Sequence, residues 1–150
     1  HTKCVGCGRC IGICNFDAVK SPNDESADIL NKKMAEYALA VVKDRPQFHI
    51  SLICDVSPNC DCHSENDAPI VPNIGMLASF DMVALDKACA DLVNAQKPFE
   101  NSNLGEQIKN NVHEKDNFHI NHPDTNWESQ IEHGEEIGLG SAEYELIEVK

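Results

Sequence analysis

Apolar residues recur at helical spacing in two segments that end in helix-breaking signals. Over 31–44 the apolar positions repeat every three or four residues, and Pro46 forbids the helix from continuing. The same spacing over 81–95 follows Asp81, whose side chain can accept hydrogen bonds from the free amides of a first helical turn. The sequence therefore predicts one helix in each segment, packed on one face.

A third helix is predicted over 126–137. Thr125 and Glu128 have the three-residue spacing of a capping box, in which two side chains satisfy the first amides of a helix. Glycine readily adopts the left-handed conformation in which many helices end, so Gly138 is expected to end this one.

Two segments are patterned as β-strands. One is predicted over 47–56 and the other over 144–149, near the C-terminus. The first strand would present two faces, with Phe48, Ile50 and Leu52 on one side and His49, Ser51 and Ile53 on the other. Together with the helices, these strands predict an α+β fold in which a small sheet is covered by helices.

Three regions interrupt this pattern. Residues 57–73 combine prolines and asparagines in turn positions with cysteines and aspartates, so we expect a long ordered loop of a kind that is often functional. Residues 100–123 are polar and weakly patterned, and we assign no element to them. The turn-rich stretch 21–26 predicts a linker. We therefore divide the chain into a cysteine segment, 1–25, and an α+β domain, 26–150.

The cysteine segment carries a metal-ligand spacing. Cys4, Cys7, Cys10 and Cys14 form the run C-x2-C-x2-C-x3-C, which is typical of ferredoxin-type [4Fe–4S] proteins. Glycines between them let the backbone curl and bring amide N–H groups toward the sulfides. A zinc knot is the alternative, but zinc motifs usually separate two cysteine pairs by a longer loop. The run predicts half of a ferredoxin-like module in an irregular N-terminal lobe, with these cysteines as cofactor ligands.

Cys14 is expected to serve a different cluster from the first three cysteines. In two-cluster ferredoxins the fourth cysteine of such a run ligates the other cluster, whose remaining ligands come from a second copy of the motif. This chain has no second copy, and it starts at His1 without an initiator methionine. We therefore expect a missing upstream motif that shares a second cluster with Cys14. The alternative is that the first cluster finds its fourth ligand elsewhere.

Further motifs occur in a fixed order after this run. They are the Ser-Pro-Asn-Cys-Asp-Cys of 57–62, the Asn-Asp-Ala-Pro-Ile-Val-Pro-Asn-Ile-Gly of 66–75, and the shorter segments 78–81, 84–89 and 138–141. Together they resemble the C-terminal region of the ferredoxin-containing proteins grouped as domain of unknown function 362. The resemblance covers essentially the whole chain. It implies a larger preceding domain, usually with a first ferredoxin motif, and it names no reaction.

A second group of cysteines lies in the predicted loop. Cys60 and Cys62 flank Asp61, and a histidine follows, so soft metal ligands gather at one place. A second metal or cluster site at Cys60 and Cys62 is one interpretation. The other is that they pack or order the loop, while Cys54 and Cys89 are small buried hydrophobic residues. Two cysteines one residue apart reach a common ion only through a tight turn.

The remaining acidic residues and histidines are expected to have structural or solvated roles. Local uses as turn former, helix cap or helix surface are available to Asp61, Asp67, Asp81 and Asp86. Metal-ligand spacing is lacking among His113, His119, His122 and His133. The sequence therefore identifies no catalytic residue.

Charge and composition exclude several classes of protein. The net charge of −13, from twelve Lys and Arg against twenty-five Asp and Glu, argues against nucleic-acid binding. No apolar run reaches the roughly 18 residues that cross a bilayer, and no export signal is visible. Eight cysteines without such a signal fit a reducing cytoplasm better than a secreted disulfide framework. We expect a cytoplasmic protein with neither nucleic-acid nor membrane partners.

Three functions fit these observations. The leading one is an iron–sulfur protein whose [4Fe–4S] cluster exchanges single electrons with a redox partner protein or with the missing N-terminal domain. The second makes the cluster a wire to an enzyme site in the Cys60 and Cys62 loop. The third makes it a structural staple in an interaction domain. Metal bound by Cys60 and Cys62 in an open pocket would favour the second, and a redox-silent cluster the third.

Overall fold

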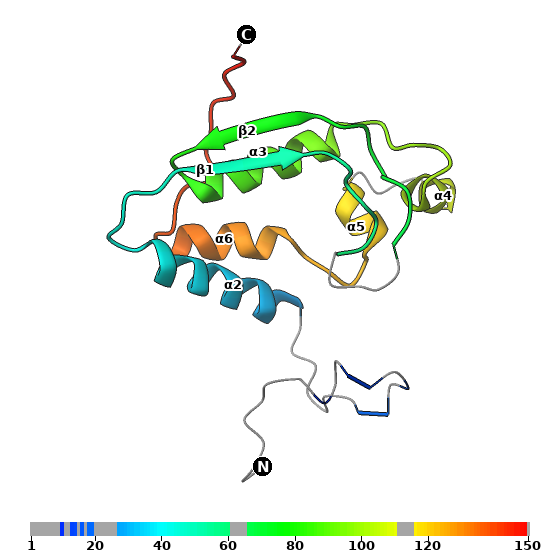
Figure 1. Cartoon of the computed structure of the whole chain (residues 1–150), viewed down its shortest axis with the longest axis horizontal. Helices are drawn as coiled ribbons and strands as arrows, with labels where there is room; N and C mark the ends of the chain where they lie inside the picture. The colour runs from blue at the N-terminus through cyan, green and yellow to red at the C-terminus, as the bar shows by residue number, and fades with distance from the viewer. Residues whose placement is uncertain are drawn as a thin grey trace.

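The computed structural model describes residues 10, 13–14, 16, 18–19, 27–60, 66–110 and 116–149. Its elements are α2 (Ala27–Val42), β1 (His49–Ile53), β2 (Gly75–Ser79), α3 (Met82–Asn94), α4 (Asn103–Asn110), α5 (Asn117–Asn121) and α6 (Glu128–Glu136). The predicted α+β class is confirmed (Figure 1). None of the helices in these ranges is long and apolar enough to cross a bilayer. The ferredoxin-like lobe predicted for 1–25 lies mostly outside the described residues.

Two predicted helices are confirmed with shifted ends. α2 begins at Ala27, ahead of residue 31, and the chain leaves it through Asp44, which has a positive φ of 59°. α3 has the predicted cap: Asp81 Oδ1 accepts hydrogen bonds from the amides of Val83 (2.9 Å) and Ala84 (3.0 Å). This cap begins the helix because those amides have no partner within the helix itself.

The third helix, α6, is confirmed, but its predicted capping box is wrong. Trp127 occupies the N-cap position without a side-chain hydrogen bond, and the Thr125 hydroxyl donates instead to the His122 carbonyl (2.8 Å). Its predicted end is confirmed. Gly138 has φ 75° and donates to the Glu135 carbonyl (3.0 Å).

The sheet contains β1 as predicted, but its partner is β2. The two strands are antiparallel, with His49 opposite Ser79 and Ile53 opposite Gly75. The predicted strand over 144–149 is wrong, because these residues have no regular secondary structure. β2 was not predicted from the sequence.

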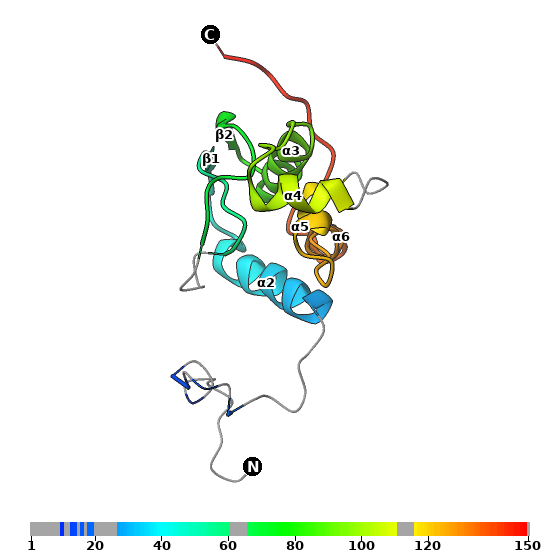
Figure 2. The same ribbon diagram turned by 90° about the vertical axis from the view of Figure 1, so that its right-hand side faces the viewer.

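α3 packs on one face of this sheet and leaves the other face exposed (Figure 2). The side of β1 that carries Ile53 is the buried one, and Ile53 is only 6% exposed. The opposite side of this segment, which carries Phe48, Ile50 and Leu52, is the more apolar side, and it is exposed. Met76 of β2 and Phe80, the residue after β2, are exposed as well. The rings of Phe48 and Phe80 lie 5.1 Å apart across the two strands.

The hydrophobic core lies at the end of the sheet where α3, α4 and α5 meet. Its buried residues are Ile53, Ile70, Val71, Val93, Leu104 and Ile120. Backbone hydrogen bonds fix the second described part of the predicted loop, 66–73, against this core, from Ile70 N to Val56 O (2.8 Å) and from Phe99 N to Ile70 O (3.0 Å). The polar region 100–123 is not featureless, since it forms α4 and α5.

α2 reaches the rest of the fold chiefly through α6, which lies beside it (Figure 1). The Asn31 side-chain amide donates to the Asn126 carbonyl (2.6 Å) and to the Ser129 hydroxyl (3.1 Å). The ring of His133 on α6 lies 3.2 Å from Glu36 of α2. These polar contacts, together with the buried Ala35, set the helix pair in register.

Candidate functional site

The thiol of Cys14 has a pKa below its usual value. Backbone hydrogen bonding from Phe16, and to a smaller extent from Ala18 and Val19, is the cause. A lowered pKa favours the thiolate, which is the form that ligates metals. Cys10 is exposed, and both Cys10 and Cys14 are free thiols. Free thiols with amide donors suit an iron–sulfur cluster, whose sulfurs usually accept such hydrogen bonds.

The other two predicted ligands, Cys4 and Cys7, lie outside the described residues. The expected division of the ligands, with Cys4, Cys7 and Cys10 at one cluster and Cys14 at another, therefore stays a prediction.

The loop that carries Cys60 is tied together by the side chain of Asn66. The Asn66 amide group donates to the Ser57 hydroxyl (3.0 Å) and to the Asn59 carbonyl (3.3 Å). Its carbonyl oxygen accepts the Asn59 amide (3.2 Å). One side chain thus bridges both sides of the loop next to the cysteine.

α5 and the residue after it hold the same loop from outside. The Asn121 side-chain amide and the His122 ring Nε2 both lie 2.6 Å from the carbonyl oxygen of Pro58, to which each donates. Asn121 Oδ1 is buried without a hydrogen-bond partner. Sequence reasoning missed this contact, because Pro58 and Asn121 are far apart in the chain and Asn121 belongs to no motif.

Cys60 itself is exposed at the end of this ordered stretch. Cys62 and Asp61 lie outside the described residues, so a metal role for Cys60 and Cys62 stays a prediction. Within the part of the chain that the structure describes, no three or more His, Cys, Asp or Glu side chains are grouped so as to hold a metal ion.

Cys89 is half-buried between α3 and β1. Burial raises the pKa of its thiol, Ser51 opposes this by a side-chain hydrogen bond, and the charge of Asp86 adds to the increase. Cys54 is also half-buried and free. Both environments fit the predicted packing role, and the raised pKa makes Cys89 a poor nucleophile at neutral pH.

Two of the aspartates have the local uses that were expected of them: Asp81 caps α3, and Asp67 accepts the amide of Ala68 (2.7 Å). The expectation for Asp61 lies outside the described residues. The histidines differ among themselves. His119 is exposed, whereas the His133 side chain is only 15% exposed, between Glu36 and Glu136. His113 lies outside the described residues.

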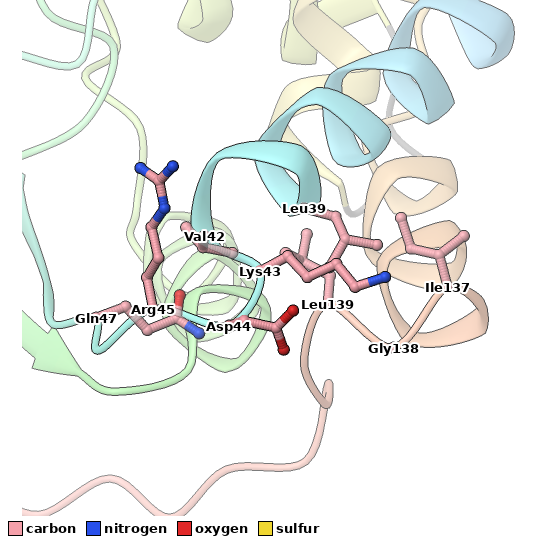
Figure 3. A pocket seen from close by; sticks show the side chains of 9 residues that line it. All are labelled: Leu39, Val42, Lys43, Asp44, Arg45, Gln47, Ile137, Gly138 and Leu139. Atoms are coloured by element: carbon pink, nitrogen blue, oxygen red, sulfur yellow. The ribbon is translucent and has the colours of Figure 1, made fainter.

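A hollow of about 430 Å³ lies where α2 and α6 end (Figure 3). Apolar side chains such as Leu39 and Leu139 line it together with the charged Lys43, Asp44 and Arg45. Figure 3 shows that Lys43 and Arg45 point away from each other. These two basic side chains therefore do not converge on one anion, and the hollow does not mark an active site.

Comparison with known proteins identifies a family. Residues 4–91 match the family described as "Domain of unknown function (DUF362)", and the match includes the whole cysteine run, the Cys60 loop and most of α3. No curated protein and no solved structure matches the chain. Since the match covers more than half of the sequence, the chain belongs to the DUF362 family.

Proposed function

We propose that this chain is an iron–sulfur protein that transfers single electrons. Cys4, Cys7 and Cys10 hold a [4Fe–4S] cluster, and Cys14 ligates a second cluster shared with another cysteine motif. The spacing of the four cysteines carries the proposal. Two further observations support it: the family match begins at Cys4, and backbone hydrogen bonding lowers the pKa of the Cys14 thiol.

A bound cluster would supply reversible one-electron chemistry, and the residues of the chain would set its potential. Amide hydrogen bonds to sulfur favour the more negative, reduced state because they offset its charge. Backbone hydrogen bonding from Phe16, Ala18 and Val19 would stabilise the reduced state in this way at Cys14. The electron partner is a redox protein or a preceding domain, and the setting is a reducing cytoplasm.

Cluster assembly tests the proposal directly. The chain is reconstituted under anaerobic conditions, iron and sulfide are counted, and the reduced protein is examined by electron paramagnetic resonance. We expect about four irons and four sulfides per chain and a reversible one-electron step. Cys7→Ser should abolish the broad visible absorption, whereas Cys54→Ser, which removes a thiol outside the motif, should retain it.

Cys14→Ser separates the two roles proposed for the motif. If Cys14 serves a second cluster, this variant should keep the iron content and the resonance signal of the unmodified chain. Loss of the signal in Cys14→Ser would show a self-sufficient single-cluster site. A cluster that forms but undergoes no redox step would contradict electron transfer and favour the structural role.

A further inference from the structure

β2 has one unpaired edge. The sheet of the described residues contains only β1 and β2, so the N–H and C=O groups on the far side of β2 face no strand. Natural edge strands are usually protected by charged residues, prolines or bulges. The β2 sequence, Gly-Met-Leu-Ala-Ser, contains neither a charge nor a proline. This edge therefore lacks the usual features that prevent another strand from pairing with it.

A groove of about 990 Å³ runs along this edge. β2 forms one wall, and the residues of α3 that line the groove are Ala84, Leu85, Ala88 and Leu92. The segment 144–149 forms the opposite wall, and Figure 2 shows the chain passing α3 on the side away from the sheet before it reaches the C-terminus. The groove thus has an apolar helix as its floor and a strand edge on one side.

The wall opposite β2 is anchored at its start and is separate from the strand. The Tyr144 hydroxyl donates to Asp91 Oδ2 (2.8 Å), and the amide of Ala142 donates to Glu135 (2.7 Å). In the described ranges no backbone hydrogen bond joins 144–149 to β2. Ile147 is 73% exposed, so its side chain does not fill the groove.

The charges around the groove have one sign. Glu145 and Glu148 belong to its lining, which contains neither lysine nor arginine. A partner with basic side chains would match these carboxylates, and apolar side chains would match the floor. Side chains of a strand alternate between two faces, so one extended segment can satisfy both requirements.

We propose that this groove binds an extended segment of a partner protein, in which apolar and basic side chains alternate, as an added strand on β2. Main-chain hydrogen bonds to the β2 edge supply affinity, and the apolar floor and the acidic wall supply selectivity. The site does not involve the cysteine segment, so it stands independently of the iron–sulfur proposal.

Peptide binding tests the proposal. The probe is an acetylated seven-residue peptide with a fluorescent label, in which lysine alternates with valine and leucine, added to the full chain and followed by fluorescence anisotropy. Two matched peptides replace lysine by glutamate, or carry N-methyl groups on alternate backbone amides. We expect the lysine peptide to bind, and each matched peptide to bind at least about tenfold more weakly.

Variants of the chain locate the binding site. Glu145→Gln combined with Glu148→Gln should weaken the lysine peptide at least about threefold and reduce the dependence of its affinity on salt. Glu143→Gln, in the same segment but outside the lining, is the control and should bind as the unmodified chain does. Amide hydrogen exchange should slow in β2 when the peptide is added.

Several outcomes would overturn the proposal. Equal binding of the N-methylated peptide would show an apolar pocket rather than strand addition. Binding that is unaffected by both glutamate substitutions would place the peptide elsewhere. Absence of binding at millimolar peptide would also overturn it, as would protection of β2 by self-association of the chain, measured by sedimentation without peptide.

Discussion

Asp81 joins the start of α3 to the C-terminal segment. Its Oδ1 accepts the amides of Val83 and Ala84, and its Oδ2 accepts the amide of Ser141 (2.9 Å). The approach is close because residue 140 is glycine: a Cβ there would lie 2.1 Å from Asp81 Oδ1. One carboxylate therefore both caps a helix and fixes the chain that leads to the groove.

Substitution of Asp81 separates these two roles. Asp81→Ala removes both and should lower the free energy of unfolding by at least about 1–2 kcal/mol, as loss of a helix cap does. Asp81→Asn keeps an oxygen for the cap but turns a donor toward the Ser141 amide, so a smaller loss is expected. Urea unfolding measures both values. Equal losses in the two variants would show that the cap contributes little.

Asp86 lies on α3 near β1, in an environment that disfavours its charge. The residue retains exposed surface, yet packed protein around the carboxyl desolvates it and raises its pKa, and the nearby His49 partly opposes this effect. The carboxyl therefore binds its proton more tightly in the folded protein than in the unfolded chain.

This shift makes the stability of the chain depend on pH. A carboxyl with a raised pKa stabilises the fold fully only below its unfolded pKa, about 3.9, and loses that contribution as pH rises through the folded value. Asp86→Asn should therefore be more stable than the unmodified chain at pH 7, by up to about 0.5 kcal/mol. The advantage should vanish at pH 3 in urea unfolding. An advantage that persists at pH 3 would assign the effect to packing instead.

At the scale of elements, α4 is placed by a close contact at Gly105. The Gly105 amide donates to the Ser102 hydroxyl (3.1 Å), which in turn donates to the Phe99 carbonyl (2.7 Å). A Cβ on residue 105 would lie 2.2 Å from that carbonyl oxygen. The helix can therefore approach the preceding turn only because this position lacks a side chain.

Gly105→Ala should force α4 away from the core. We expect the free energy of unfolding to fall by about 1–3 kcal/mol, the usual result of overpacking. The control is Lys109→Ala, on the exposed surface of the same helix, which should change stability by less than about 0.5 kcal/mol. An unchanged urea midpoint for Gly105→Ala would show that α4 moves freely.

The sequence predicted those elements whose pattern reflects burial on one face. α2 and α3 were found because their apolar residues have helical spacing and α3 has a capping aspartate. β2 was missed because Gly75–Ser79 contains no β-branched or aromatic residue. The strand prediction for 144–149 was misleading, since a strand also needs a neighbouring backbone, and the sequence of one segment does not specify its neighbour.

The candidate sites were predictable to different degrees for a similar reason. Cysteine spacing is local, so the candidate ligands of the motif could be named from the sequence. The contacts of Asn121 and His122 with Pro58 join distant segments, and only the folded chain brings them together. The groove along β2 was unpredictable for the same reason, since β2 itself was missed.

At the scale of the whole molecule, the described helices and strands form two parts. One part is the helix pair α2 and α6, and the other is the sheet with α3, α4 and α5. The contact of α3 with α6 is the main connection between the two parts. The whole chain carries a net charge of −13. Such a charge repels acidic partners and attracts basic ones over distances up to about the Debye length, roughly 8 Å at physiological salt. The preference proposed for the groove agrees with this overall field.

The connection between the two strands sets when the sheet can form during folding. β2 leads almost directly into α3, so these elements can pack early, whereas β1 must be brought back across residues 54–74. Each doubling of loop length raises the entropic barrier to closure by about 0.6 kcal/mol. A Gly-Ser insert between Ser64 and Glu65 that doubles the loop should therefore slow folding about threefold and leave unfolding unchanged in stopped-flow experiments. Faster unfolding instead would place the pairing of β1 after the rate-limiting step.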